Sequence, residues 1–250
     1  MSVTFFGSHF SVRVHVRPLA LAGVLALLTT QVHAQQAPPA PAGRGQGAVP
    51  PAAGRAQAPY DLSGTWVALV TEDWRYRLLT PPKGNADFMP VNAEARRVME
   101  TWDPAKDEAS GEACRAYGAA GVMRLPGRLQ ISWENDTTLK VDLEAGTQTR
   151  RFLFGTPPPA GEPSWQGTSA ARWMFPPVGR GGRGGPPVTG QLVVTTTGMR
   201  PGYLRKNGIP YSANASLTEY FVRIVDDDGQ EYLAVTTMVD DPQYLVQPYI

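Results

Sequence analysis

The chain has 250 residues, with 23 Lys and Arg against 22 Asp and Glu, so its formal net charge is only +1. A charge this close to neutral gives no electrostatic reason to expect nucleic acid as a partner. The 26 Gly and 24 Pro are numerous, but 42% of the residues are apolar. The composition therefore excludes a chain that is disordered throughout, because enough apolar residues remain to build a core.

The three histidines, His9, His15 and His33, all lie near the N-terminus. The same region has the pattern of a signal peptide, with two arginines before a short apolar run at 19–28 and a small-residue cleavage site at Ala34. The apolar run is too short to span a bilayer. We expect residues 1–34 to be removed after about Ala34, the protein to be periplasmic or secreted, and the mature chain to lack a transmembrane segment.

A mature chain without histidine excludes the catalytic pairs and metal sites that depend on imidazole. The lone Cys114 excludes a disulfide framework and an iron–sulfur cluster, and we expect it to be a small buried residue. No glycine-rich phosphate-binding motif follows a predicted strand, so nothing indicates a nucleotide. The sequence therefore predicts neither a metal nor a cofactor.

Two regions follow the signal peptide. Of the 24 residues at 35–58, 17 are Pro, Ala or Gly and none is aromatic, so we expect a disordered linker. All six Trp and all nine Tyr lie in residues 59–250. The size and composition of that region predict one folded domain.

Most of the domain has the pattern of β-strands. Residues 127–134 and 138–144 alternate apolar with polar side chains, and turn residues separate them. An Asp-Gly pair at 228–229 predicts a hairpin between the last two strands. The predicted strands are residues 64–71, 127–134, 138–144, 147–154, 190–197, 217–225 and 231–239.

Helices are few. A helix is predicted at 93–102, with Asn92 as its N-cap and an Asp-Pro pair at 103–104 as its end. A second short helical turn is predicted within 110–117. Strands joined by short turns, without βαβ spacing, favour antiparallel pairing. The sequence therefore predicts a mainly β fold, a single antiparallel lipocalin-like (calycin-type) up-and-down β-barrel with one or two short helices, and a β-sandwich is the alternative.

Two resemblances support the barrel. The Gly-x-Trp at 64–66 resembles the first strand of lipocalin-like barrels, where the Trp packs across the barrel floor. Nearly the whole domain resembles a family of exported proteins of Gram-negative bacteria. The shared motifs are SGTW at 63–66, TEDWRYR at 71–77, CRAYGAAGVMRLPGRL at 114–129, GTQTRRFLFG at 146–155, RPGYLRKNGIPYSA at 200–213, LTEYF at 217–221 and DDPQYLVQPY at 240–249. The resemblance implies a lipocalin-like barrel and a tail beyond Ile250, and it transfers no activity.

The densest chemical cluster lies at 71–77. On a strand, Glu72, Trp74 and Tyr76 share one face, and Arg77 lies on the other. A carboxylate beside two aromatic rings suits the lining of a barrel that holds a flat ligand. The favoured alternative is an ordinary strand with an outward ladder of charges.

Two further segments carry candidate ligand-binding residues. Arg115 and Tyr117 suit a clamp for a carboxylate or phenolate, although an arginine packed on an aromatic face is the favoured alternative. Residues 200–211 predict a loop with two turns that carries Tyr203 and Arg205. Such a loop suits the entrance of a barrel, and an ordinary solvated loop is the alternative.

Glu219 and Arg223 share one face of a predicted strand. Facing inward, Glu219 would be a ligand anchor or an acid. The opposite face is more apolar, so the sequence favours an outward position for the charged pair. Asp240 and Asp241 precede a proline and predict a turn rather than a catalytic pair.

Three functions follow from these residues. The leading hypothesis is a protein that binds a small hydrophobic or aromatic molecule, through Trp66, Trp74, Tyr76, Arg77, Arg115, Tyr117, Tyr203, Arg205 and Glu219. The second is a histidine-independent isomerase, cyclase or hydrolase that acts on a hydrophobic small molecule. It would use Glu72 or Glu219 as acid or base and Tyr76 or Tyr117 as a donor to an oxyanion. The third is an envelope-associated structural protein. The sequence favours binding over catalysis, and it leaves open the ligand, the oligomeric state and whether the barrel is hollow.

Overall fold

The computed structural model describes residues 54–70, 74–156, 161–176 and 190–250. The expected signal peptide, residues 35–53 of the expected linker, and Glu72 lie outside the described residues. So does most of the glycine-rich segment that precedes residue 190. All described residues belong to one compact unit, and no helix among them is long and apolar enough to cross a bilayer.

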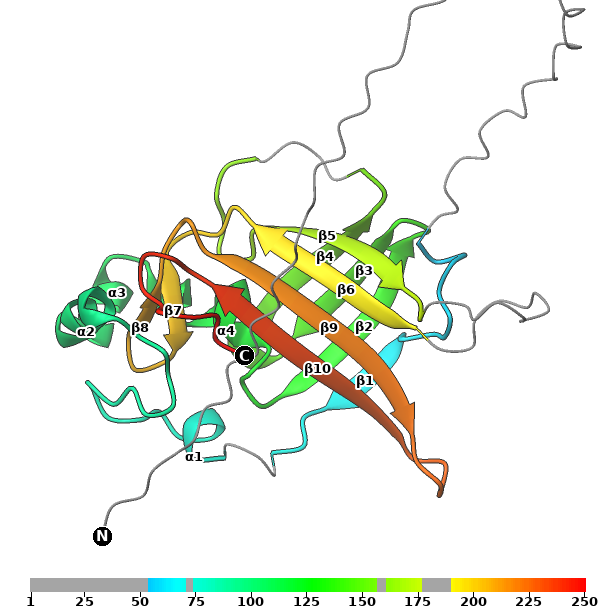
Figure 1. Cartoon of the computed structure of the whole chain (residues 1–250), viewed down its shortest axis with the longest axis horizontal. Coiled ribbons are helices and arrows are strands. Elements are labelled where there is room, and N and C mark those ends of the chain that lie inside the picture. Colours follow the sequence, from blue (N-terminus) through cyan, green and yellow to red (C-terminus); the bar gives the residue numbers. More distant parts are fainter. Residues whose placement is uncertain (1–53, 71–73, 157–160, 177–189) are drawn as a thin grey trace, which may run out of the picture. The chain divides into compact units, whose positions relative to one another are not determined.

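An eight-stranded sheet curves into a nearly closed barrel (Figure 1). The strand order is β1-β2-β3-β4-β5-β6-β9-β10, so β1 and β10 are the two edges. The mainly β, lipocalin-like barrel predicted from the sequence is thereby confirmed. The strands are β1 (Gly64–Val67), β2 (Arg128–Asn135), β3 (Thr138–Leu143), β4 (Gln148–Phe154), β5 (Thr168–Met174), β6 (Gln191–Thr197), β9 (Ser216–Val225) and β10 (Glu231–Asp240).

The predicted hairpins form because alternate side chains are buried and because turn residues adopt the backbone conformation that the turn requires. In the antiparallel pair of β2 and β3, Ile131 lies opposite Val141, and both side chains are buried in the barrel. The hairpin of β9 and β10 turns at residues 226–230, where Gly229 has a φ of 77° and its N–H donates to the Asp226 carbonyl. A positive φ suits glycine, which explains the Asp-Gly signal.

One pair of strands differs from the antiparallel prediction. β4 and β5 are parallel, and β5 itself was not predicted from the sequence. Between the end of β4 at Phe154 and the start of β5 at Thr168 the chain has about the dozen residues that a parallel pair needs for its crossover. Because all other neighbours are antiparallel, this single parallel step makes β1 and β10 run in the same direction.

The folded domain begins earlier than residue 59. The indole Nε1 of Trp173 donates to the carbonyl of Gly54 over 2.7 Å, and the Arg55 N–H donates to the Asp136 carbonyl over 3.0 Å. Residues 54–58 were assigned to the linker because they lack large apolar side chains. Their backbone groups nevertheless hold them against the barrel.

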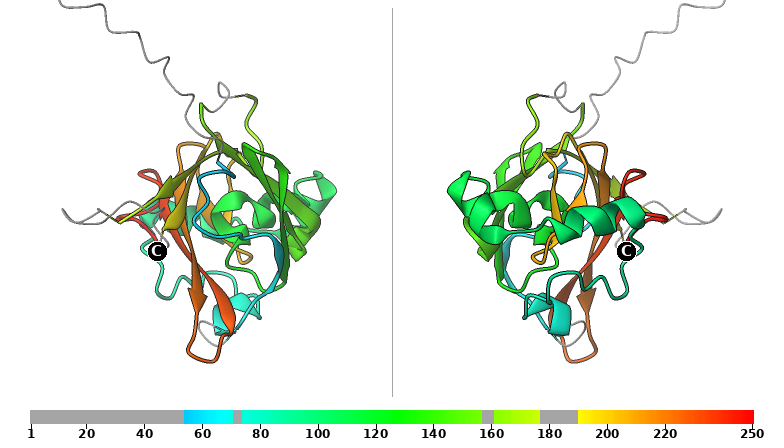
Figure 2. Two further views of the ribbon diagram at one scale, coloured as in Figure 1. Left: turned by 90° about the vertical axis from the view of Figure 1, so that its right-hand side faces the viewer. Right: turned by 90° about the vertical axis from the view of Figure 1, so that its left-hand side faces the viewer.

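Helices and a small hairpin lie across one end of the barrel (Figure 2). The predicted N-cap is confirmed, since the Asn92 side chain accepts a hydrogen bond from the Ala95 N–H over 2.9 Å. Asp103 follows that helix, and its side chain also caps the N-terminus of the next helix. The predicted loop at 200–211 is instead a buried hairpin. The elements are α2 (Ala93–Glu100), α3 (Pro104–Ala109), the 3-10 helix η1 (Ala113–Tyr117), α4 (Ala119–Val122), β7 (Gly202–Arg205) and β8 (Ile209–Tyr211).

Candidate ligand-binding site

The middle of the barrel is filled by its own side chains. The inward positions of four strands are fully buried, and they include Leu139, Val141, Phe152, Leu192, Val194 and Phe221. The rings of Phe152 and Phe221 lie with their centroids 5.4 Å apart. This packed interior leaves the sides of the barrel as the place to look for a ligand site.

An ion pair is sealed within that interior. Arg150 on β4 donates from Nη1 and Nη2 to the two carboxylate oxygens of Glu219 on β9, over 2.8 and 2.6 Å. The Thr196 hydroxyl accepts from Arg150 over 3.1 Å and lies 2.8 Å from the Ser169 hydroxyl. Both charged side chains are fully buried.

The favoured outward position of Glu219 is therefore wrong. Glu219 faces inward because Arg150, 69 residues away in the sequence, supplies a bidentate partner that offsets the desolvation of the carboxylate. Arg223 lies on the same face but further along β9, where it pairs with Glu231 at the exposed end of the hairpin. The two charges that the sequence grouped together thus have separate partners.

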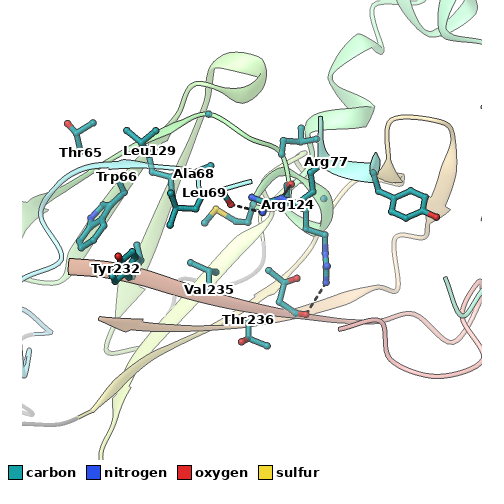
Figure 3. Close-up of a pocket in the computed structure, with 18 of the residues that line it drawn as sticks. Thr65, Trp66, Ala68, Leu69, Arg77, Arg124, Leu129, Tyr232, Val235 and Thr236 are labelled. Atoms are coloured by element: carbon teal, nitrogen blue, oxygen red, sulfur yellow. Dashed lines mark hydrogen bonds between the residues drawn. The ribbon is translucent and has the colours of Figure 1, made fainter. Parts of the chain in front are cut away.

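A cavity of about 1010 Å³ lies between the two edge strands, β1 and β10 (Figure 3). We call it the seam pocket. Its apolar lining includes Trp66, Met123, Leu129, Leu233 and Val235, all of which are partly buried at the margin of the barrel core. The seam pocket is therefore the side of the core that a pairing of β1 with β10 would have covered.

Trp66 is held in place within the seam pocket. Its indole Nε1 donates to the carbonyl of Leu62 over 3.0 Å. The bond satisfies the polar group of the indole, so the remaining ring offers a flat apolar surface to the cavity.

Arginines line one end of the seam pocket. Arg77 donates from Nε to the Arg124 carbonyl over 2.9 Å and from Nη1 to the Leu69 carbonyl over 3.1 Å. Arg124 donates to the Thr237 carbonyl over 3.2 Å. In Figure 3, Trp66 and Tyr232 lie towards one end of the pocket, and Arg77 and Arg124 lie towards the other.

Arg205 also lines the seam pocket, from the end of β7. Its side chain donates to the Asp87 carbonyl over 3.0 Å, and its guanidinium carbon lies 4.2 Å from the centre of the Tyr76 ring. The Tyr76 ring in turn packs edge-on against Phe88. Arg205 is 9% exposed, so the hairpin that replaces the predicted loop holds its guanidinium firmly.

The predicted strand at 71–77 is wrong over its described part. Trp74–Arg77 is α1, a single helical turn closed by a hydrogen bond from the Leu78 N–H to the Trp74 carbonyl over 2.9 Å. A strand would have placed Tyr76 and Arg77 on opposite faces. On the helical turn both line the seam pocket, and Trp74 is exposed beside Arg75.

Arg115 is not available to hold a ligand, because other side chains of the protein already contact its guanidinium group. Its Nη1 lies 2.9 Å from Oδ1 of Asp107, and its guanidinium lies over the Tyr203 ring. The Tyr203 hydroxyl donates to the other Asp107 oxygen over 2.9 Å. Burial, together with this bond to a carboxylate, raises the pKa of Tyr203 to about 12. Tyr117 lies elsewhere, with its ring close to Gly146.

Carboxylates are scarce in the seam pocket. Among the side chains of its described lining residues, the only carboxylate is that of Glu231, which is paired with Arg223. The buried Asp241 accepts bonds from the Ser212 N–H and hydroxyl and from the Gln243 N–H, as a turn residue would. No group of three His, Cys, Asp or Glu residues in the described part of the chain is placed to hold a metal ion. Cys114, expected to be buried, is only partly so.

Four of the nine predicted ligand-binding residues thus meet in one pocket, namely Trp66, Tyr76, Arg77 and Arg205. The other five lie outside it: Trp74, Arg115, Tyr117, Tyr203 and Glu219. The sequence missed most of the apolar lining. The alternation that predicts an inward Leu129 is a usable signal, but nothing local indicates which inward residues lie beside an open seam.

The fold and the pocket together define the class, a lipocalin-like β-barrel with a cavity at its seam. Comparisons with protein-family models, with curated proteins and with solved structures each gave no match. The resemblance to a family of exported bacterial proteins accordingly stays a prediction.

Proposed function

We propose that the protein binds a small hydrophobic or aromatic molecule in the seam pocket. The observation that carries the proposal is that the pocket opens directly onto the margin of the apolar core, beside Trp66, Leu129 and Val235. Exposed apolar surface of this kind is costly in water, and a ligand would cover it. The signal peptide predicted from the sequence supports a site of action in the periplasm or outside the cell.

The dimensions of the pocket support a small molecule. A cavity of about 1010 Å³ is at the upper end of the range for drug-sized ligands. Aromatic side chains such as Trp66 and Tyr232 stack on flat or aliphatic groups with little loss of conformational freedom. Charged side chains gather at the Arg77 end, where polar contacts would orient a mainly apolar ligand.

The test is a titration of the purified protein with N-phenyl-1-naphthylamine, an uncharged aromatic probe whose emission rises in apolar surroundings. We expect saturable binding with one probe per chain. Trp66→Ala should weaken the affinity by about tenfold, because truncation of a contact aromatic removes roughly 1.4 kcal/mol or more.

The matched control is Trp133→Ala. Trp133 is also partly buried against the barrel core, and it packs on Phe154, but it does not line the seam pocket. This variant should bind the probe as the unaltered protein does. Absence of saturable binding by the unaltered protein would refute the proposed function, and an equal loss in both variants would move the site away from the seam.

A further inference from the structure

The seam pocket is polarised along its length. Its cationic lining residues are Arg77, Arg124, Arg205 and Lys206. Arg124 reaches the backbone of Thr237, so this group lies towards the C-terminal part of β10. The single carboxylate side chain of the described lining, that of Glu231, lies at the other end of that strand and is paired with Arg223. The charged side chains of the described lining at the first end are therefore all cationic.

Arg77 and Arg205 differ from three other arginines that are partly or fully buried. Arg115, Arg150 and Arg223 each pair with a carboxylate. Among the described residues, the hydrogen bonds of Arg77 and Arg205 go to backbone carbonyls only. A carbonyl oxygen satisfies an N–H but carries no full charge, so within the described part of the chain no carboxylate pairs with either guanidinium.

Donors also remain on both side chains. A guanidinium has five N–H groups. The bonds described above use two of those of Arg77 and one of those of Arg205. The planar fork of an arginine is well suited to the two oxygens of a carboxylate or a phosphate.

The position of Arg205 favours an anionic partner. Its side chain is nearly buried, and Tyr76 and the Asp87 carbonyl fix its orientation. Taking a cation out of water is costly unless an anion accompanies it. A ligand with a negative head group would supply that anion in an orientation that the protein has already set.

We propose that the seam pocket takes an amphipathic anion. Its carboxylate or phosphate lies at Arg77 and Arg205, and its apolar tail lies along Trp66, Leu129 and Val235. This assignment rests on the proposed function, since it concerns the same pocket, and it adds the chemical class of the ligand and its direction in the cavity.

The experiment is displacement of bound N-phenyl-1-naphthylamine by three competitors with the same tail, used below their micellar concentrations: dodecanoate, dodecanol and dodecyltrimethylammonium. Dodecanoate should displace the probe at about tenfold lower concentration than dodecanol, because a charged hydrogen bond adds about that much affinity. The cationic competitor should be the weakest. Dodecyl phosphate, tested in parallel, distinguishes a phosphate head from a carboxylate.

Two variants test the assignment of the residues. Arg77→Gln and Arg205→Gln should each reduce the preference for dodecanoate over dodecanol, while dodecanol itself binds as before. Arg77 is the safer variant for folding, since it is the more exposed of the two. Arg151→Gln is the matched control, because Arg151 pairs with Glu134 and neither residue lines the seam pocket, and it should keep the full preference.

The outcomes separate the two proposals. If the uncharged probe does not bind, the proposed function fails, and the class of ligand fails with it. If the probe binds and dodecanol competes as well as dodecanoate, the pocket stands and the anionic class is wrong. A preference for dodecanoate that survives in both arginine variants would overturn the placement of the head group.

Discussion

Arginines in the sealed interior and arginines at the seam pocket have different kinds of hydrogen-bond partners. In the interior, Arg150 meets Glu219 through two hydrogen bonds, and neither side chain is exposed. At the seam, Arg77 and Arg205 meet backbone carbonyls, and the described lining also includes apolar side chains such as Trp66 and Val235. In the interior the two charges pair with each other, whereas the seam has a cavity with room for a molecule from outside the protein.

The comparison separates a region that stabilises the fold from the region that is proposed to bind a ligand. A buried ion pair fixes which side chains face inward, because either charge alone would be costly to bury. The seam has no such constraint, since it is open to solvent on one side. The following predictions test this division, and the largest expected effect comes first.

The ion pair should be the most sensitive point of the fold. Glu219→Ala leaves the buried Arg150 without its carboxylate, and we expect the free energy of unfolding to fall by about 3–5 kcal/mol. Urea denaturation followed by tryptophan fluorescence measures the change. The double variant Arg150→Met with Glu219→Leu should recover most of it, because both charges are then gone. A double variant no more stable than the single one would show that the pair has another role.

A matched pair of Val→Phe substitutions compares packing in the two regions. Val194 is fully buried in the interior, and Val194→Phe should cost about 1–3 kcal/mol through overpacking. Val235 lines the seam pocket, where there is room for a ring. Val235→Phe should leave the urea midpoint nearly unchanged and weaken binding of the uncharged probe. Equal destabilisation by both substitutions would mean that the seam is as closely packed as the interior.

The stability of the protein should depend on pH through the cluster of Arg115, Asp107 and Tyr203. The polar groups of this cluster pair with one another, as those of the interior do. The pKa of Tyr203 is about 12 in the folded protein, against an ordinary value of 10.0. The stabilising effect is fully present below pH 10.0 and is lost as the pH rises towards 12, because the unfolded chain releases its proton first.

The measurement is the urea midpoint at pH 9 and at pH 11, about one pH unit either side of the ordinary tyrosine pKa. Tyr203→Phe should show a smaller fall than the unaltered protein, since the substituted side chain does not titrate. An identical fall in both proteins would assign the effect to other groups, of which the buried Tyr211 is the first to examine, because burial raises its pKa as well.

The smallest effect is expected from the exposed pair of Arg223 and Glu231. Both side chains reach solvent at the open end of the β9–β10 hairpin. Exposed pairs contribute little, because water and salt screen them. Arg223→Gln should therefore not shift the urea midpoint measurably. A clear shift would indicate that the end of the hairpin is less solvated than its exposure implies.

Local patterns in the sequence determined a large part of the fold. Alternation predicted the hairpins of β2, β3 and β4, the Asp-Gly turn predicted the hairpin of β9 and β10, and Asn92 was correctly assigned as an N-cap. These features depend on residues that are close in the chain, so a short window contains the information. The Gly-x-Trp motif also pointed to Trp66, which lines the seam pocket.

The tertiary structure alone decided the parallel step between β4 and β5, the inward position of Glu219 and the location of the pocket. Each depends on partners far apart in the sequence: Arg150 lies 69 residues before Glu219, and the seam joins the first strand of the sheet to the last. Alternation states which residues share a face, but not which face is inward when a distant charge can compensate a buried one. The sequence therefore determined the barrel and several of its side chains, and only the folded chain showed where the barrel stays open.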